Sequence, residues 1–266
     1  MVSLKHFIFK HLPLFFLAVY STLMIFPNLD NSALQVDEGG DTFISTTLLK
    51  SHFPRHSDGI NSSMLFANVH DGLFVYRPWV AYYIQSFSLS LFGQTTFAAR
   101  LPFALIGVFA VIFLYRFALK FTDQQFVAFL AAFFLASSIP ALIFFRTARY
   151  VGVPILLSTL LLNFYIDIYK NKKWNPLPLT VISIIFFHTM YVEFAGIIIG
   201  VLIHFFIHYK ETLPENRQRA VWAAGITGIF CIPWLIFISP VFPHIYKYLA
   251  SMSIVIDLSW QGAFKR

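Results

Sequence analysis

Residues 101–119, LPFALIGVFAVIFLYRFAL, form an apolar run whose single charged residue is Arg116. A helix of this length covers roughly 28 Å at 1.5 Å per residue, close to the thickness of the hydrocarbon core of a bilayer. The run therefore predicts a membrane-spanning helix and an all-α fold, a polytopic membrane bundle. Six further apolar runs predict the other spans: Leu12–Pro27, Phe126–Phe145, Val153–Tyr169, Leu177–His188, Val192–His208 and Val221–Ile238.

The composition supports the same class. Hydrophobic residues make up 58% of the 266 residues and charged residues only 12%, more apolar surface than a soluble domain of this size can bury. The net charge of +7 does not indicate nucleic-acid binding, because the basic residues are scattered or lie in short loops between apolar runs. Cys231 is the single cysteine, which excludes a disulfide framework. Residues 1–20 lack a signal-peptide cleavage site, so we expect an uncleaved first span.

Segment Pro78–Phe92 decides the topology. It has 15 residues, fewer than the ~17 that a span needs. If it does not cross and the N-terminus is inside, the cytoplasmic loops hold the basic residues that short loops on that side favour. These residues are Arg116, Lys120, Lys170, Lys172, Lys173, Lys210, Arg217 and Arg219. We therefore predict about seven spans, of which Leu177–His188 is the shortest, and an interfacial or re-entrant helix at Pro78–Phe92.

The predicted organisation has a membrane core over residues 1–240. Within it, residues 28–93 form an extracytoplasmic loop with interfacial helices, one of them over residues 42–49. Residues 241–266 form an extracytoplasmic tail, with an amphipathic piece around Tyr246–Ile256, that would begin a C-terminal region beyond this chain. Counting the spans from a cytoplasmic N-terminus places four features on the outer side together with the tail: the Asp37/Glu38 loop, Arg77, the turn Arg146–Tyr150 and the turn His188–Glu193.

Asp37 and Glu38, in the stretch Val36-Asp37-Glu38-Gly39-Gly40, are the candidate catalytic residues. Two adjacent carboxylates at the mouth of a span are costly and are usually kept for function. Such a carboxylate can act as a general base, or hold a divalent cation such as Mg²⁺ or Mn²⁺, for which Asp37 is the candidate ligand. The structural alternative is a helix N-terminus, where acidic residues complement the partial positive charge.

Five basic residues are candidates for binding an anionic group. Arg77 precedes Pro78, and its guanidinium can reach a phosphate at headgroup level. Arg146 and Arg149 are three residues apart at an outer span end, against the trend for basic residues to lie inside. Arg100 and His188 complete the set. For Arg77 and Arg100 the structural alternative is snorkelling to the interface, and for His188 a structural hydrogen bond.

The order of motifs resembles the GT-C class of membrane glycosyltransferases, in the lineage of the protein O-mannosyltransferases, the lipid A aminoarabinose transferase and the bacterial enzymes that decorate lipopolysaccharide core. The resemblance covers residues 10–240. It rests on a run of short motifs: Asp37-Glu38 after the first span, Arg77-Pro78 before an aromatic-rich helix, Leu91-Phe92-Gly93, Ala99-Arg100-Leu101-Pro102 and Arg146-Thr147-Ala148-Arg149-Tyr150.

The resemblance implies a membrane core of seven spans with an extracytoplasmic site and a polyprenyl-phosphate-linked sugar as donor. It implies that Asp37 is the catalytic carboxylate, as base or metal ligand, and that Arg77 contacts the donor phosphate. This chain departs from the pattern at two places. Tyr76 stands where the aminoarabinose branch has an acidic residue, and Tyr150-Val151-Gly152 carries no aspartate after the third span. Both departures argue against a metal site built from three carboxylates.

The function predicted from these residues is glycosyl transfer from a polyprenyl-phosphate donor to an extracytoplasmic glycolipid, glycan or protein, at the bacterial inner membrane with the site facing outward. Membrane lipid is a partner and nucleic acid is not. The alternative is a non-catalytic transporter or lipid-binding scaffold, or an inactive fragment of such an enzyme. Glycine-rich phosphate loops, HExxH and Ser-centred triads are missing from the sequence, which argues against a nucleotide-driven pump.

Overall fold

A computed structural model describes residues 4–62, 72–170, 175–241 and 243. Within this part of the chain the secondary structure is helical, apart from two isolated β-bridges in the loop after α2, Arg55 to Leu73 and Ser57 to Ser62. The predicted fold class, an all-α helical bundle, is confirmed. The ten α-helices are α1 Leu4–Ile25, α2 Val36–Ser51, α3 Val80–Phe92, α4 Thr96–Thr122, α5 Gln125–Ser137, α6 Ile139–Arg146, α7 Gly152–Tyr169, α8 Pro176–Phe187, α9 Tyr191–Ile207 and α10 Pro214–Ile238.

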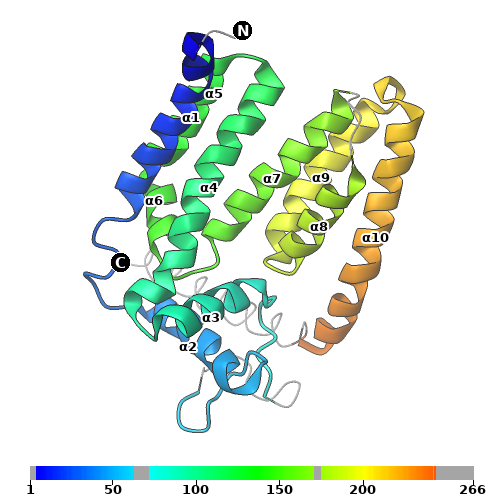
Figure 1. Cartoon of the computed structure of the whole chain (residues 1–266). Coiled ribbons are helices and arrows are strands. Elements are labelled where there is room, and N and C mark those ends of the chain that lie inside the picture. The colour runs from blue at the N-terminus through cyan, green and yellow to red at the C-terminus, as the bar shows by residue number, and fades with distance from the viewer. Residues whose placement is uncertain (1–3, 63–71, 171–174, 242, 244–266) are drawn as a thin grey trace, which may run out of the picture.

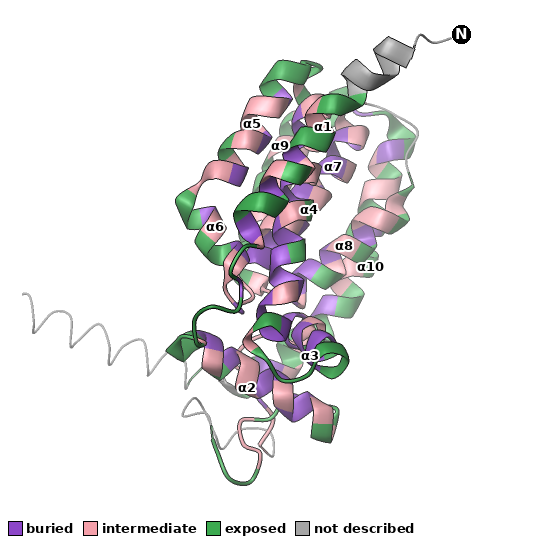
Figure 2. Ribbon diagram, turned by 60° about the vertical axis from the view of Figure 1, so that its left-hand side comes forward, coloured by how far each residue is buried: buried purple, intermediate pink, exposed green. Residues whose placement is uncertain are grey.

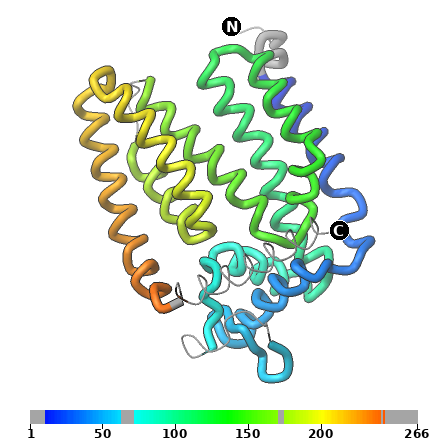
Figure 3. The backbone as a smooth tube through the Cα atoms, turned by 180° about the vertical axis from the view of Figure 1, so that it is seen from behind, coloured from blue at the N-terminus to red at the C-terminus, as the bar shows by residue number. Residues whose placement is uncertain are grey.

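The helices form a bundle with two short helices across one end (Figure 1). The long helices α1, α4, α7 and α10 run along the bundle together with α5, α8 and α9, whereas α2 and α3 lie across its lower end in this view. Seen from behind, the arrangement is the same (Figure 3). Helix α4 is central, because it packs against α1, α3, α5, α6 and α7. Most of the segment Pro78–Phe92 forms α3, which lies across the end of the bundle; its interfacial or re-entrant placement in the membrane stays a prediction.

Among the described residues, three helices are long and apolar enough to cross a membrane: α4, α7 and α10. The pair α5 and α6 adds a fourth candidate if the two are one broken span. Residues 11–25 of α1, α8 and α9 are apolar but shorter. The count of seven spans and the side of the membrane to which each end belongs stay predictions.

The run Phe126–Phe145 is one continuous segment in sequence but two helices in the structure. Helices α5 and α6 meet at 62°, with Ser138 in an extended conformation between them. Pro140 explains the break, because proline lacks the N–H of a helical residue and its ring collides with the carbonyl group four residues back, at Ala136. As the second residue of a new helix, Pro140 is tolerated.

The short interfacial helix predicted over residues 42–49 is the middle of a longer helix, α2, which begins at Val36. Its early start places both predicted carboxylates on the helix itself. The amphipathic piece Tyr246–Ile256 lies outside the described residues, as do Lys172 and most of the turn-rich stretch 57–71.

The core is tightest where α4 meets α6. Figure 2 shows buried residues along α4, and Phe145 of α6 is fully buried in a cluster that includes Ala104 and Ala110 of α4. Gly107 faces this ring: a Cβ atom at residue 107 would lie 2.5 Å from Phe145 Cγ and 2.7 Å from its Cβ. Both atoms lie near the backbone of Phe145, so a side chain at residue 107 has nowhere to go.

We expect Gly107→Ala to destabilise the protein by about 1–3 kcal/mol through overpacking. The matched control is Gly225→Ala in α10, where an added Cβ has nothing within 4 Å and alanine is the better helix former. Thermal unfolding in detergent compares the two variants. An equal effect of both substitutions would contradict the close packing of α6 on α4.

Candidate active site

Helix α2 begins with the two predicted carboxylates. Gln35 precedes it in an extended conformation, and Asp37 and Glu38 occupy its first turn. The Glu38 carboxylate reaches back to accept the Gln35 backbone N–H at 2.9 Å, half of a capping box. The helix N-terminus considered as the structural alternative is therefore present. It accounts for Glu38 more fully than for Asp37, whose side chain is 67% exposed.

Glu38 is completely buried and paired with Arg100 of α4. Arg100 Nε donates to Glu38 Oε1 and Arg100 Nη2 to Oε2, both at 2.8 Å, which is the bidentate geometry that makes such pairs strong. The backbone N–H of Ala148 donates to Oε1 at 2.7 Å. Burial raises the pKa of Glu38, but these hydrogen bonds outweigh it, and the pKa lies below its usual value.

The Arg100 guanidinium has a second set of partners in the loop between α1 and α2. It donates to the backbone carbonyl groups of Leu29, Ser32 and Ala33 at 2.9–3.2 Å. Arg100 was a candidate for the donor phosphate, but each of its three nitrogens already donates to the protein. We infer that Glu38 and Arg100 hold α2, α4 and this loop together, and that they act on a substrate only through this framework.

Asp41 is the residue that the sequence interpretation missed. It lies one helical turn after Asp37 and is only 8% exposed. Its Oδ1 accepts from Arg77 Nη1 at 2.7 Å and from the Tyr82 hydroxyl at 3.2 Å. Its Oδ2 is buried without a hydrogen-bond partner in the described part of the chain. Burial raises the pKa of Asp41 above its usual value, and the positive charges of Arg77 and Arg149 only partly oppose this.

Arg77 and Arg149 meet at these carboxylates. Arg149 Nη1 lies 2.9 Å from Asp37 Oδ2, and Arg149 Nε lies 3.8 Å from Asp41 Oδ2. Arg77 lies over the ring of Tyr150, 4.6 Å from its centroid, and Arg149 is 6.0 Å from the same centroid. Two guanidinium groups thus share one buried carboxylate and one aromatic ring, with the exposed Asp37 at the edge. We call Asp37, Asp41, Arg77 and Arg149 the charge cluster.

Arg146 does not join the charge cluster. Its guanidinium donates to the carbonyl groups of Met24, Ile25 and Pro27 at 2.7–3.1 Å, at the C-terminal end of α1. The last carbonyl groups of a helix have no partners inside the helix, and a cation there is favourable. Of the three arginines Arg77, Arg146 and Arg149, which were candidates for binding an anionic group, only Arg77 and Arg149 come together, while Arg146 caps α1.

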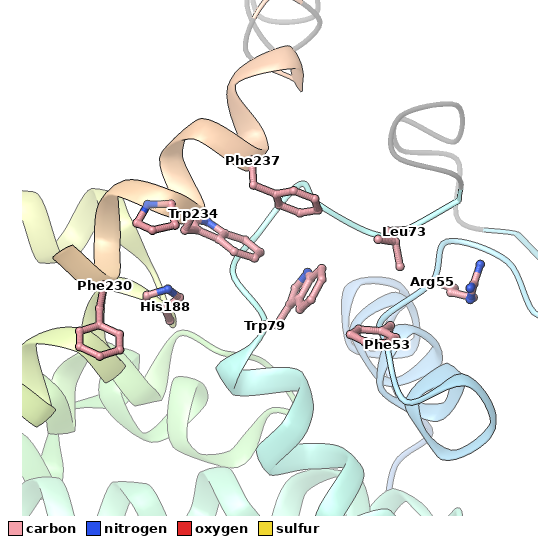
Figure 4. A pocket seen from close by; sticks show the side chains of 9 residues that line it. Phe53, Arg55, Leu73, Trp79, His188, Phe230, Trp234 and Phe237 are labelled. Atoms are coloured by element: carbon pink, nitrogen blue, oxygen red, sulfur yellow. The ribbon is translucent and has the colours of Figure 1, made fainter. Parts of the chain in front are cut away.

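His188 lies at the end of α8 and is not part of the charge cluster. Its Nδ1 bonds the carbonyl oxygen of Ile184 at 2.9 Å, and its own carbonyl accepts the N–H of Val80 at 3.1 Å, which joins α8 to the start of α3. Its imidazole lines a separate cavity (Figure 4). The structural alternative for His188, a hydrogen bond to the protein, is therefore present.

The charge cluster does not fit a resident divalent metal. The described residues contain no group of three histidine, cysteine or acidic side chains able to hold one. The two carboxylates of the charge cluster, Asp37 and Asp41, both face Arg149, and a dication between them would be repelled by that guanidinium. The role of Asp37 as a metal ligand stays a prediction, and we route no chemical step through a metal.

The helical bundle with acidic and basic residues gathered at one end fits a GT-C type membrane glycosyltransferase. A family model described as dolichyl-phosphate-mannose-protein mannosyltransferase matches residues 76–237, which is more than half of the chain, and the chain belongs to this family. The match includes Arg77, Arg149 and His188 and begins after α2. No curated protein and no solved structure matches the chain.

Membership makes the chain an integral membrane glycosyltransferase of the mannosyltransferase-like kind. The family suggests a polyprenyl-phosphate-linked sugar as the donor.

We expect Glu38→Gln to destabilise the protein by about 3–5 kcal/mol, because it leaves the buried Arg100 guanidinium without its counter-charge. Unfolding of the purified protein at neutral pH measures this. Asp123→Asn is the control, since Asp123 also pairs with a cation, Lys170, but is 79% exposed. A Glu38→Gln variant as stable as Asp123→Asn would remove the structural role.

The same pair predicts an acid dependence of stability. The folded-state pKa of Glu38 lies below the usual 4.5, so its contribution is present above pH 4.5 and is lost as the pH falls through the folded-state value. We expect the difference in unfolding free energy between wild type and Glu38→Gln to shrink below pH 4.5. A difference that stays constant to lower pH would show that the charge of Glu38 does not carry the effect.

Proposed function

We propose that this protein transfers a glycosyl group from a polyprenyl-phosphate donor to a hydroxyl or amine of an extracytoplasmic glycolipid, glycan or protein. The observation that carries the proposal is the charge cluster, in which an exposed carboxylate, Asp37, pairs with Arg149, and Arg149 and Arg77 share the buried carboxylate of Asp41. We place the cluster on the outer face of a bacterial inner membrane, because the loop charges favour that topology.

Arg77 and Arg149 would bind the donor phosphate. Their contacts with protein are few for two guanidinium groups, and Arg149 Nε is buried without a hydrogen-bond partner among the described residues. Asp41 holds both cations in place and limits their mutual repulsion before the donor arrives. A phosphate that enters this cluster gains charge-assisted hydrogen bonds, which are about twice as strong as neutral ones.

Asp37 would act as the general base. It accepts the proton of the acceptor hydroxyl while the acceptor oxygen forms its bond to the anomeric carbon. The bond between that carbon and the phosphate oxygen breaks, and the electron pair leaves with polyprenyl phosphate. Arg77 and Arg149 stabilise the charge that develops on this leaving group. A single displacement of this kind inverts the configuration at the anomeric carbon.

Asp37→Asn tests the base. The side chain keeps its shape but loses its proton-accepting power, so we expect transfer to fall roughly 10²-fold or more. Binding of polyprenyl phosphate should change little, because the phosphate ligands are arginines. Asp30→Asn, an exposed aspartate in the preceding loop, is the control. Transfer is measured in membranes with extracted polyprenyl-phosphate sugars.

Near wild-type transfer by Asp37→Asn would remove the catalytic role of Asp37 and leave an N-terminal helix residue, where loss of the charge costs only stability. If the wild type binds polyprenyl phosphate but transfers no sugar to any acceptor, the chain is the non-catalytic transporter or scaffold.

The two arginines of the charge cluster are expected to differ from the one that caps α1. Arg77→Gln and Arg149→Gln should each weaken binding of polyprenyl phosphate by about ten- to a hundredfold, the usual value of a hydrogen bond to a charged group. Arg146→Gln should leave binding unchanged and lower thermal stability instead. Titration of the three variants with polyprenyl phosphate in detergent gives the comparison. An equal loss of polyprenyl-phosphate binding in all three variants would show that the arginines of the charge cluster bind phosphate no more specifically than Arg146 at the end of α1.

A further inference from the structure

A cavity lies at the same end of the bundle as the charge cluster and is not part of it. It has a volume of about 760 Å³ and lies between the start of α3, the end of α8, the end of α10 and the loop after α2 (Figure 4). A volume of this size is typical of small-molecule sites. Its lining comprises Phe53, Arg55, Leu73, Trp79, His188, Phe230, Pro233, Trp234 and Phe237.

The walls of this cavity are aromatic and fixed. Trp79 is anchored by its indole N–H, which donates to the carbonyl oxygen of Phe74 at 2.7 Å. Trp234 meets Trp79 edge to face with ring centroids 5.1 Å apart, and Phe237 and Phe53 lie edge-on to Trp79 at 6.2 and 6.1 Å. Such pairs hold the rings rigidly at little entropic cost. The cavity is therefore preformed.

Two polar atoms of the lining complement each other. Trp234 Nε1 is buried and has no hydrogen-bond partner in the described residues, and it can only donate. His188 Nδ1 bonds a carbonyl oxygen, so it carries the proton. In the neutral imidazole Nε2 is then an acceptor. The two rings are neighbours, with centroids 5.9 Å apart. The cavity thus offers one donor and one acceptor among aromatic walls.

We propose that this cavity binds a sugar ring of the acceptor. A hydroxyl group both donates and accepts, so neighbouring hydroxyls of a pyranose match Trp234 Nε1 and His188 Nε2, while the apolar face of the ring packs against Trp79 and Trp234. An isoprenoid chain would fill the same volume but leave the buried indole N–H unpaired, which is costly. The acceptor class is therefore a glycan or glycolipid. This assignment rests on the proposed function.

The position of the cavity suits an acceptor next to the donor phosphate. Trp79 is two residues from Arg77, so their Cα atoms are at most about 7 Å apart. The hydrogen bond from the Val80 N–H to the His188 carbonyl joins the start of α3 to the far wall of the cavity. A sugar bound against Trp79 and Trp234 is then close enough to present a hydroxyl to the charge cluster.

The test is a titration of the purified protein with methyl α-mannopyranoside and with methyl β-galactopyranoside. Binding is measured by saturation-transfer NMR in a detergent without a sugar headgroup. We expect saturable binding of at least one glycoside. Trp234→Phe keeps an aromatic ring and removes only the N–H, and His188→Phe removes the acceptor. Each should weaken binding about five- to tenfold, the usual effect of one lost hydrogen bond. Trp222→Phe, on the same helix but 61% exposed and outside the cavity, should bind as wild type.

Three results would overturn the proposal. The first is no saturable binding of glycoside by the folded wild type up to about 100 mM, and the second is equal glycoside binding by Trp234→Phe and Trp222→Phe. The third is displacement of the glycoside by farnesol, which would assign the cavity to a lipid chain.

The failure of this proposal can be told apart from the failure of the proposed function. Asp37→Asn should bind the glycoside normally and lose transfer. If Trp234→Phe binds the glycoside normally and Asp37→Asn is inactive in transfer, only the acceptor cavity is disproved. If Trp234→Phe binds the glycoside more weakly and Asp37→Asn is fully active in transfer, only the catalytic proposal is disproved.

Discussion

The buried ion pair between Glu38 and Arg100 is the interaction on which the end of the bundle depends. Its hydrogen bonds reach the loop after α1, the first turn of α2, the first part of α4 and the turn before α7. A bidentate pair fixes both position and angle, which hydrophobic packing alone does less sharply. Because Asp37 and Asp41 lie on the same helix as Glu38, the pair also sets where the exposed carboxylate stands relative to Arg149.

Three carboxylates on two turns of one helix thus have different surroundings and different tasks. Glu38 is buried and fully hydrogen-bonded, Asp41 is buried and holds two cations, and Asp37 is exposed and paired at its edge with Arg149. Adjacent residues of a helix point in different directions, whereas residues four apart share a face. This geometry places Asp37 and Asp41 toward the arginines and turns Glu38 inward.

The apolar runs predicted the helices, and their lengths and loop charges placed Asp37, Arg77, the Arg149 turn and His188 at one end, where the structure has them. The roles of Arg100 and Arg146 could not be predicted, because each depends on backbone carbonyl groups more than 60 residues away. The role of Asp41 could have been predicted: once α2 is taken to begin at Val36, residue 41 lies on the same helix face as Asp37. Pro140 indicates the break between α5 and α6, but the break does not interrupt the apolar run, so the hydropathy alone predicts one helix.

The partners of Glu38 are spread along the chain in a way that sets an order of assembly. Gln35 is synthesised beside it, Arg100 follows 62 residues later, and the Ala148 N–H 110 residues later. Until α4 has been made, the Glu38 carboxylate has no counter-charge and must stay in water. The loop after α1 can therefore dock only after α4 is in place, and α2 reaches its final position only when the turn before α7 arrives. The carboxylates and arginines meet late in biogenesis, so the nascent chain carries no assembled site while its first half is being inserted.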